Sequence, residues 1–152
     1  MSESKCNMKT TTVRTPEEME PIAREVLERF GAGSVAAVIA LSGELGVGKT
    51  IFTKALAQVL GVTEHITSPT FVVMKQYATT HPVFKKLIHI DAYRVEDLEE
   101  MRVIDLPRLL EEEGSVLCIE WPERIAAMIP ERACRVTIAS LDEHTRTVTY
   151  GD

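Results

Sequence analysis

Residues 43–50 read G-E-L-G-V-G-K-T, a complete match to the pattern G-x-x-x-x-G-K-[ST]. This pattern requires a buried strand before it and a helix after it. Residues 35–41 form an unbroken apolar run, V-A-A-V-I-A-L, which is typical of a parallel strand buried on both faces. After the octapeptide, apolar residues recur at helical spacing from Phe52 to Leu60. Both neighbours are present, so we interpret the octapeptide as a phosphate-binding loop.

The residue types of this loop suit a triphosphate. Its three glycines let the backbone curl so that successive N–H groups point at phosphate oxygens, beside the positive end of the following helix. The lysine is expected to reach the β and γ phosphates, and the threonine hydroxyl to take a Mg²⁺ position. We therefore predict a nucleotide site formed by the whole loop: Gly43, Glu44, Leu45, Gly46, Val47, Gly48, Lys49 and Thr50.

Length and composition describe an ordinary globular chain. It has 152 residues, of which 45% are hydrophobic and 26% charged, enough for one domain with one core. We expect a single P-loop ATPase domain over residues 1–152, with residues 1–8 flexible. No apolar stretch approaches the ~20 residues that span a bilayer. Residues 1–7 also lack the apolar segment of a secretory signal.

Charge and cysteine content narrow the possible environments and partners. The three cysteines are scattered and form no C-x-x-C pair, which favours reduced thiols and a cytoplasmic location. The four histidines lack metal-ligand spacing. The net charge of −6 argues against direct binding to nucleic acid, because such binding depends on neutralising phosphates.

The first third of the chain predicts a strand and a helix before the loop. Residues 9–13 are β-prone, and residues 15–30 have helical periodicity. Thr15 and Glu18 have the spacing of a capping box at the start of this helix. Pro21 is expected to kink the first turn or to delay the regular helix.

The rest of the chain adds strands and short helices. Residues 70–77 and 83–90 predict an antiparallel hairpin, and residues 95–113 predict two short helices broken around Pro107. The remaining predicted elements are a buried strand at 116–121, a helix at 122–129, and strands at 135–139 and 146–150. This order predicts an α/β fold: a mixed, mostly parallel sheet with an added antiparallel hairpin and helices on both faces. The nucleotide belongs at the carboxyl ends of the parallel strands.

Two acidic residues end apolar strands and are candidates for the metal site. A P-loop ATPase needs an acid in this position to hold Mg²⁺ or its water shell. Glu120 follows V-L-C-I and Asp91 follows L-I-H-I. The strand before Glu120 is the more completely apolar, so we favour Glu120 for the metal and expect Asp91 to orient water or substrate. An acid at a strand end can also face solvent or cap a helix, so both roles are hypotheses.

Two further features concern the γ-phosphate and the base. Residues 67–71, T-S-P-T-F, place hydroxyl groups where GTPases carry a loop that senses the γ-phosphate. S-P-T is also an ordinary turn before a strand, and both interpretations stay open. The motif N-K-x-D, which reads guanine in many GTPases, is absent, and this favours adenine.

These motifs together resemble a known family. The phosphate loop, S-P-T-F at 68–71, H-I-D-A-Y-R at 89–94 and I-E-W-P-E at 119–123 stand in the order and spacing of the TsaE (YjeE) family. This is the ATPase subunit of bacterial tRNA threonylcarbamoyladenosine biosynthesis, and the resemblance covers residues 15–150. It implies a small cytoplasmic ATPase that uses ATP and Mg²⁺.

The resemblance also implies partners. TsaE-like proteins assist a complex of TsaB and TsaD, which transfers a threonylcarbamoyl group to N6 of adenosine 37 of tRNA. The tRNA is then an indirect partner, reached through that complex, and neither DNA nor a membrane is expected to bind.

The resemblance assigns roles to single residues as well. It implies that Thr50 and Glu120 hold Mg²⁺, and that Asp91 and Glu120 are needed for catalysis. Thr70 resembles the switch-like threonine of the family and is counted with the catalytic residues.

Three more residues are expected near the nucleotide. Trp121 matches a tryptophan beside the metal-binding acid, although packing explains it equally well. Arg146 resembles a basic residue on the last hairpin, and Thr15 lies where the N-terminal segment passes the base. An exposed arginine and a helix-capping threonine are the alternative interpretations.

Two other classes of protein share such a loop. A small-molecule P-loop kinase needs an acceptor pocket and usually an arginine-bearing lid, whereas residues 95–113 are acidic. The loop also begins only at residue 43, after a whole helix, whereas many small kinases begin with it. A nucleotide-gated binding module with negligible turnover is the third class. The products made from ATP distinguish the three.

Overall fold

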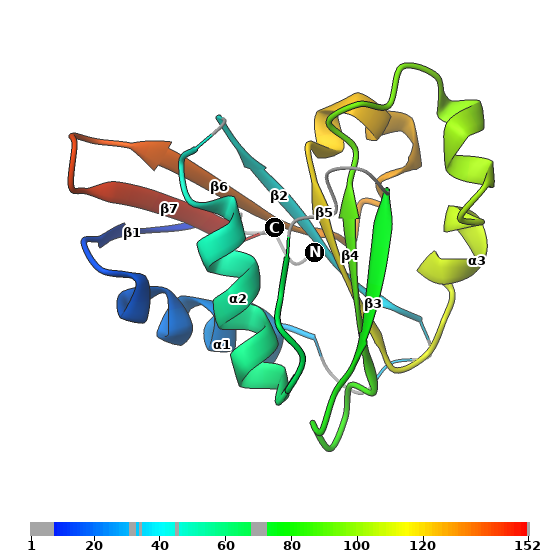
Figure 1. Ribbon diagram of the computed structural model, residues 1–152, viewed down its shortest axis with the longest axis horizontal. Helices are drawn as coiled ribbons and strands as arrows, with labels where there is room; N and C mark the ends of the chain where they lie inside the picture. The colour runs from blue at the N-terminus through cyan, green and yellow to red at the C-terminus, as the bar shows by residue number, and fades with distance from the viewer. Residues whose placement is uncertain (1–7, 31–32, 34, 45, 68–72, 152) are drawn as a thin grey trace, which may run out of the picture.

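The computed structural model describes residues 8–30, 33, 35–44, 46–67 and 73–151. Its strands are β1 (Lys9–Val13), β2 (Ala37–Gly43), β3 (Met74–Ala78), β4 (Lys86–Asp91), β5 (Ser115–Glu120), β6 (Cys134–Ser140) and β7 (Arg146–Gly151). Within the described residues these seven strands form one sheet in the order β1-β7-β6-β2-β5-β4-β3 (Figure 1). The central strands β6, β2, β5 and β4 are parallel, and antiparallel strands flank them on both sides.

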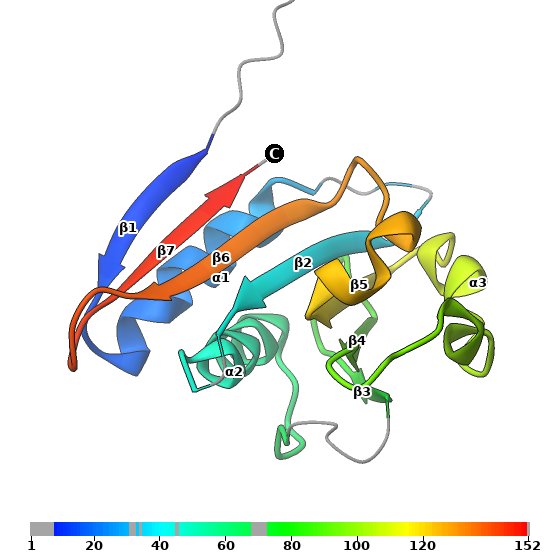
Figure 2. The same ribbon diagram turned by 90° about the horizontal axis from the view of Figure 1, so that it is seen from above.

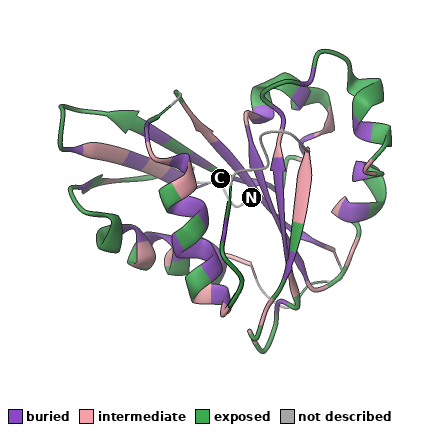
Figure 3. Ribbon diagram, in the orientation of Figure 1, coloured by how far each residue is buried: buried purple, intermediate pink, exposed green. Residues whose placement is uncertain are grey.

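Helices cover both faces of this sheet, as the sequence predicts. The helices α1 (Met19–Glu28) and α2 (Lys49–Leu60) pack on one face. The other face is covered by α3 (Leu106–Leu110) and by the 3-10 segments η2 (Leu98–Arg102) and η3 (Pro122–Met128). Figure 2 shows the two groups on opposite sides of the central strands. Figure 3 shows these strands buried along most of their length, so the predicted fold class is confirmed.

The strand before the loop lies two residues later than the apolar run of residues 35–41 indicates. β2 includes Ser42 and Gly43, which pair with Thr137 and Ile138 of β6. Hydrogen bonding to a neighbouring strand therefore extends β2 past its apolar residues, and this pairing is invisible in the local pattern.

The start of the first helix also differs from the prediction. Residues Pro16–Glu18 form a 3-10 turn, η1, and the α-helix begins only at Met19, so the predicted delay around Pro21 is confirmed. The capping box is wrong. No capping hydrogen bond from the Thr15 side chain is found among the described residues, and Glu18 Oε2 accepts instead from the backbone N–H of Arg14 at 2.9 Å. The tighter 3-10 turn changes which N–H group the carboxylate reaches.

The hairpin and the acidic segment follow the predicted order with shifted boundaries. β3 and β4 pair antiparallel, with Met74 opposite Ile90, and residues 70–72 of the predicted first strand lie outside the described part. Between η2 and α3 the chain turns at Asp105, which has a φ of 53°. Pro107 lies in the first turn of α3, so the break precedes this proline instead of surrounding it.

The C-terminal third agrees with the prediction except around one tryptophan. Trp121 has a φ of 56° and leaves the sheet, so β5 ends at Glu120 instead of residue 121. The following helix is of the 3-10 type and is kinked at Ile125. β6 and β7 form the expected final pair. The sequence predicts that residues 1–8 are flexible. Only Met8 of these is among the described residues, so this stays a prediction. No described helix is long and apolar enough to cross a membrane.

Candidate functional site

The phosphate loop joins the carboxyl end of β2 to the first turn of α2. Gly46 and Gly48 have φ values of 74° and 113°, which side chains with a Cβ rarely adopt. A Cβ on Gly43 would lie 2.7 Å from Val47 Cγ1 and 2.8 Å from the backbone oxygen of Ile138. All three glycines of the motif are therefore required by the local geometry. Leu45 lies outside the described residues.

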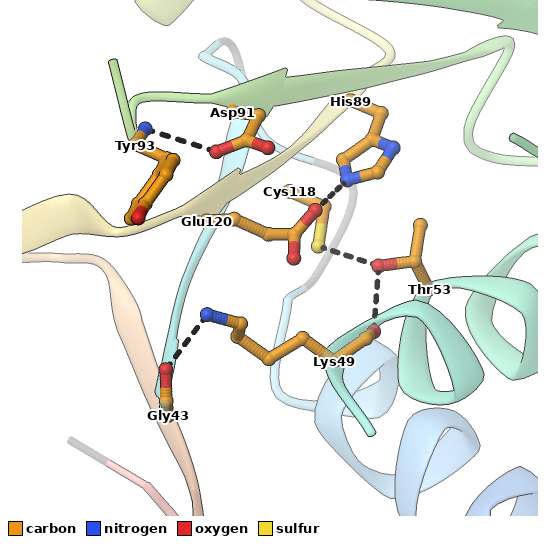
Figure 4. A network of polar contacts seen from close by, with 8 residues as sticks. All are labelled: Gly43, Lys49, Thr53, His89, Asp91, Tyr93, Cys118 and Glu120. Carbon is orange, nitrogen blue, oxygen red and sulfur yellow. Dashed lines mark hydrogen bonds and ion pairs between the residues drawn. The ribbon is translucent and has the colours of Figure 1, made fainter. Parts of the chain in front are cut away.

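Lys49 is buried at the first position of α2. Its Nζ donates to the backbone oxygen of Gly43 at 2.7 Å (Figure 4). The same nitrogen lies 3.7 Å from the centre of the Trp121 ring. Burial lowers the pKa of Lys49, and the negative charges of Glu120 and Asp91 act in the opposite direction. The loop lysine and both candidate acids therefore share one electrostatic environment, which water screens only in part.

The two acids lie side by side at the carboxyl ends of neighbouring strands. Asp91 and Glu120 are register partners in the parallel pair of β4 and β5. Glu120 is buried, whereas Asp91 is partly exposed. Burial raises the pKa of Asp91 and the charge of Glu120 raises it further, while a 2.9 Å hydrogen bond from the backbone N–H of Tyr93 opposes both. The structure brings together the acids that the sequence placed 29 residues apart.

A buried histidine contacts Glu120 from the side of the core. His89 Nε2 lies 2.5 Å from Glu120 Oε2, and the two side chains are 0% and 5% exposed. His89 Nδ1 has no hydrogen-bond partner in the described part of the chain. The histidines lack metal-ligand spacing in the sequence, and that pattern does not predict this contact. The available signal was a polar residue inside the apolar strand L-I-H-I.

The interior beneath Lys49 contains two more polar groups. Thr53 Oγ1 donates to the backbone oxygen of Lys49 at 3.1 Å and lies 3.8 Å from Cys118 Sγ. Burial raises the pKa of Cys118 to about 12, so this residue stays a thiol and packs in the core. Cys118 is fully buried.

The oxygen donors at this corner suit Mg²⁺ held together with a nucleotide. The carboxylates of Glu120 and Asp91 and the hydroxyl of Thr50, the second residue of α2, are hard ligands of the kind that Mg²⁺ prefers. Among the described residues, no group of three or more His, Cys, Asp or Glu side chains is arranged to hold a metal. Mg²⁺ in phosphate sites takes one or two protein ligands and completes its shell with phosphates and water. The donor set fits that mode of binding.

A pocket of about 290 Å³ opens beside the loop. Gly46 and Gly48 line it from the loop, Thr15 from the N-terminal segment and Arg146 from β7. Arg146 Nε also donates to the backbone oxygen of Val47 at 3.1 Å. Thr15, expected near the base, and Arg146, expected near the nucleotide, thus line one pocket at the loop, although 131 positions separate them in the chain.

Trp121 and Thr70 are the remaining residues that the sequence predicts for the site. Trp121 follows Glu120 directly, and its ring centre lies 5.1 Å from that of Tyr93. Thr70 lies outside the described residues, so its expected switch role stays a prediction. At the start of that segment, Thr67 accepts a hydrogen bond from Lys75 Nζ.

Comparison with known proteins connects this geometry to a family. The family model described as "Threonylcarbamoyl adenosine biosynthesis protein TsaE" matches residues 13–148. The chain is 34% identical over 135 residues to the Bacillus subtilis "tRNA threonylcarbamoyladenosine biosynthesis protein TsaE", covering 89% of this chain and 80% of that protein. The Aquifex aeolicus protein of the same name is 35% identical over 145 residues, or 93% and 94% of the two chains.

The fold has a solved counterpart as well. A crystal structure of YdiB from Bacillus subtilis matches with a TM-score of 0.72 and 27% sequence identity. The match covers 97% of this chain and 87% of that one.

Proposed function

The chain belongs to the TsaE family of threonylcarbamoyladenosine biosynthesis proteins, and on this premise we propose that it binds and hydrolyses Mg-ATP. The observation that carries the proposal is the position of Lys49, a buried cation at a phosphate loop, within the field of two strand-end carboxylates. Phosphoryl transfer depends mostly on positioning and on electrostatic stabilisation of phosphate oxygens, and these groups supply both.

Each group of the corner has a distinct part in the proposal. The backbone N–H groups of the loop and the positive end of α2 bind the phosphates. Lys49 exchanges the Gly43 oxygen for β and γ phosphate oxygens. Thr50 and Glu120 would hold Mg²⁺, and the ion would supply neutralisation of negative charge on the phosphates. Asp91 accepts a hydrogen bond from the attacking water, and its raised pKa makes it a better proton acceptor.

The pocket beside the loop is proposed to take the adenine base. It adjoins the loop at Gly46 and Gly48, so a base bound there would lie next to the phosphate-binding backbone. Arg146 has a second part, because its hydrogen bond to Val47 fixes the loop backbone from β7. This bond supports the loop whether or not Arg146 also contacts the nucleotide.

The proposed partner is the TsaB–TsaD complex, with tRNA reached through it in the cytoplasm. Hydrolysis by so small a domain has to be coupled to other work by contact. The segments proposed to respond to the γ-phosphate are residues 67–71, from their place in the sequence, and the corner at 91–94, which begins with Asp91. ATP binding then favours one arrangement of these surfaces, and partner and nucleotide strengthen each other's binding by the same factor.

The ATPase proposal is tested by the products that the purified chain makes from ATP. The chain alone and with the TsaB–TsaD pair is incubated with Mg-ATP, with and without nucleoside and small-molecule acceptors. We expect inorganic phosphate. A phosphorylated acceptor identifies a kinase, and the absence of both products identifies a binding module; either result overturns the proposal.

The coupling is tested in a reconstituted reaction. TsaB–TsaD, tRNA and threonylcarbamoyl-adenylate are combined with the wild-type chain, with the Lys49→Ala variant or with neither. We expect repeated turnovers of tRNA modification only with the wild type. Equal turnover in all three reactions would remove the proposed role in the pathway.

A further inference from the structure

We propose that His89 is a positioning residue that orients the Glu120 carboxylate toward the nucleotide. The inference rests on the proposed Mg-ATP site and adds to it a side chain that touches neither metal nor nucleotide. His89 acts through Glu120, from the interior of the sheet.

The strand geometry places the imidazole behind the carboxylate. In the parallel pair of β4 and β5, His89 is the register partner of Cys118, and Asp91 that of Glu120. Alternate residues of a strand point to the same face, so His89 and Glu120 both face α2. His89 Nε2 and Glu120 Oε2 lie 2.5 Å apart, so the two side chains are in direct contact, diagonally across the two strands, inside the core.

The backbone of Glu120 is held by the same strand. The N–H of Ala92, one residue beyond β4, donates to the Glu120 backbone oxygen at 3.0 Å. β4 thus fixes the backbone of the acid through Ala92 and its side chain through His89. Both contacts are buried or nearly so, and water does not compete for the carboxylate from this side.

The direction of the hydrogen bond follows from the chemistry of the pair. A carboxylate oxygen accepts, so the hydrogen belongs to His89 Nε2. Nδ1 is buried without a partner in the described chain, which is unfavourable for a polar atom. Leu87 and Ile90 show that aliphatic residues pack well in this strand. The imidazole is therefore useful for its bond to Glu120 and not for packing.

The consequence is that only one oxygen of Glu120 remains available. Oε2 is bound to His89, and Figure 4 shows the other oxygen pointing to the side of the site on which Lys49 lies. A carboxylate held at one oxygen cannot rotate freely, so its second oxygen is presented in a defined direction. Residues that orient metal ligands in this way typically change metal affinity by about 10–100-fold when removed.

The test measures metal dependence separately from catalysis. ADP binding to wild type, His89→Leu and His89→Gln is followed by calorimetry across a Mg²⁺ titration and again in EDTA. We expect His89→Leu to raise the Mg²⁺ concentration needed for tight binding by about 10–100-fold. Affinity in EDTA should stay unchanged, because the loop contacts are intact. His89→Gln keeps an N–H donor and should recover most of the Mg²⁺ response.

A matched control separates orientation from general packing. Cys118 lies beside His89 in the neighbouring strand, on the same face and equally buried, but it does not contact the Glu120 carboxylate through any described hydrogen bond. Cys118→Ala should lower the melting temperature without changing the Mg²⁺ requirement. The proposal would be overturned if His89→Leu and Cys118→Ala changed the Mg²⁺ requirement equally. It would also be overturned if neither substitution changed that requirement.

A second design covers the case in which His89→Leu does not fold. His89→Asn, whose side chain is too short to reach Glu120, is then compared in the wild-type and Glu120→Gln backgrounds. If His89 acts through Glu120, the change that it causes in the Mg²⁺ requirement disappears in the second background. Additive effects of the two substitutions contradict the inference. If the wild type itself shows no Mg²⁺-dependent nucleotide binding, the proposed function is rejected, and this inference with it.

Discussion

The two faces of the central strands differ in where polar groups enter the core. Facing α3 and η3, the described middle positions of β2, β4 and β5 are all aliphatic: Val38, Ala40, Ile88, Ile90, Leu117 and Ile119. Facing α2, the same strands start with aliphatic residues, but β4 and β5 continue into His89, Cys118 and Glu120. The polar groups therefore lie toward the carboxyl ends of these strands, which is the edge of the sheet where the phosphate loop begins.

This difference assigns separate tasks to the two faces. The aliphatic face stabilises the fold by removing apolar surface from water. The face toward α2 buries a lysine, a histidine and a glutamate, which is unfavourable unless each has a partner. Here His89 and Glu120 are partners of each other, and Lys49 donates to the backbone oxygen of Gly43 within the field of Glu120, so the polar groups form one site. Changes on the two faces should therefore have different consequences.

The largest expected effect is on the polar face, at Lys49. Lys49→Ala should lower the rate of ATP hydrolysis about 100–1000-fold, the range typical for removing one preorganised charge-stabilising group. The fold should survive, because burial already lowers the pKa of Lys49 and its charged form is not what stabilises the interior. Phosphate release and thermal unfolding measure the two properties. Lys54→Ala, an exposed lysine on the same helix, is the control and should behave as wild type.

On the aliphatic face, the expected effect is on stability instead of activity. Leu117→Ala leaves a cavity in a fully buried position and should lower the free energy of unfolding by about 2–5 kcal/mol. Denaturant unfolding measures this loss. ADP affinity of the folded variant should equal that of the wild type, because Leu117 points away from the loop. A clear fall in affinity would show that the two faces are not separate.

A smaller effect concerns the contact between Lys49 and Trp121. Phosphates that draw Lys49 Nζ away from its position 3.7 Å from the ring centre should change Trp121 fluorescence saturably. Trp121 is the only tryptophan in the chain, so the signal is unambiguous. In Lys49→Ala the emission should already differ without nucleotide. A flat titration of the wild type, with binding shown by calorimetry, would contradict the position proposed for the phosphates.

The smallest effect is the pH dependence contributed by Asp91. Burial raises its folded-state pKa above the ordinary value of 3.8, so the folded chain binds this proton more readily than the unfolded chain. The resulting stabilisation is complete below the unfolded pKa and is lost as pH rises through the folded pKa. The stability of the wild type relative to Asp91→Asn should therefore decrease with rising pH across this acidic range.

Urea unfolding at steps of pH checks this sign. Asp142 supplies the opposite case, because a hydrogen bond from the backbone N–H of His144 lowers its pKa. The stabilisation of the folded chain by Asp142 should therefore increase as pH rises. If the stability of the wild type relative to Asp91→Asn and relative to Asp142→Asn changed with pH in the same direction, the role of burial at Asp91 would be contradicted.

Several features of the fold and site were predictable because they depend on neighbouring residues. The glycines of residues 43–50 and the helical spacing after them predict a strand, a loop and α2, and all three are present. Asp91 and Glu120 were identified as strand-end acids from their own apolar runs. The boundaries of β2 and the capping box were wrong, because strand pairing and a 3-10 turn outweigh local preference there.

By itself, then, the sequence determined the loop, the order of the elements and the family, since each rests on adjacent residues or on motifs in order. Only the tertiary structure decided which side chains meet. His89 and Glu120 lie 31 positions apart, and Arg146 reaches Val47 across 99. Such contacts depend on strand order and register, which long-range pairing sets and which a local pattern does not contain. The polar site at the end of the sheet is for this reason a property of the assembled strands.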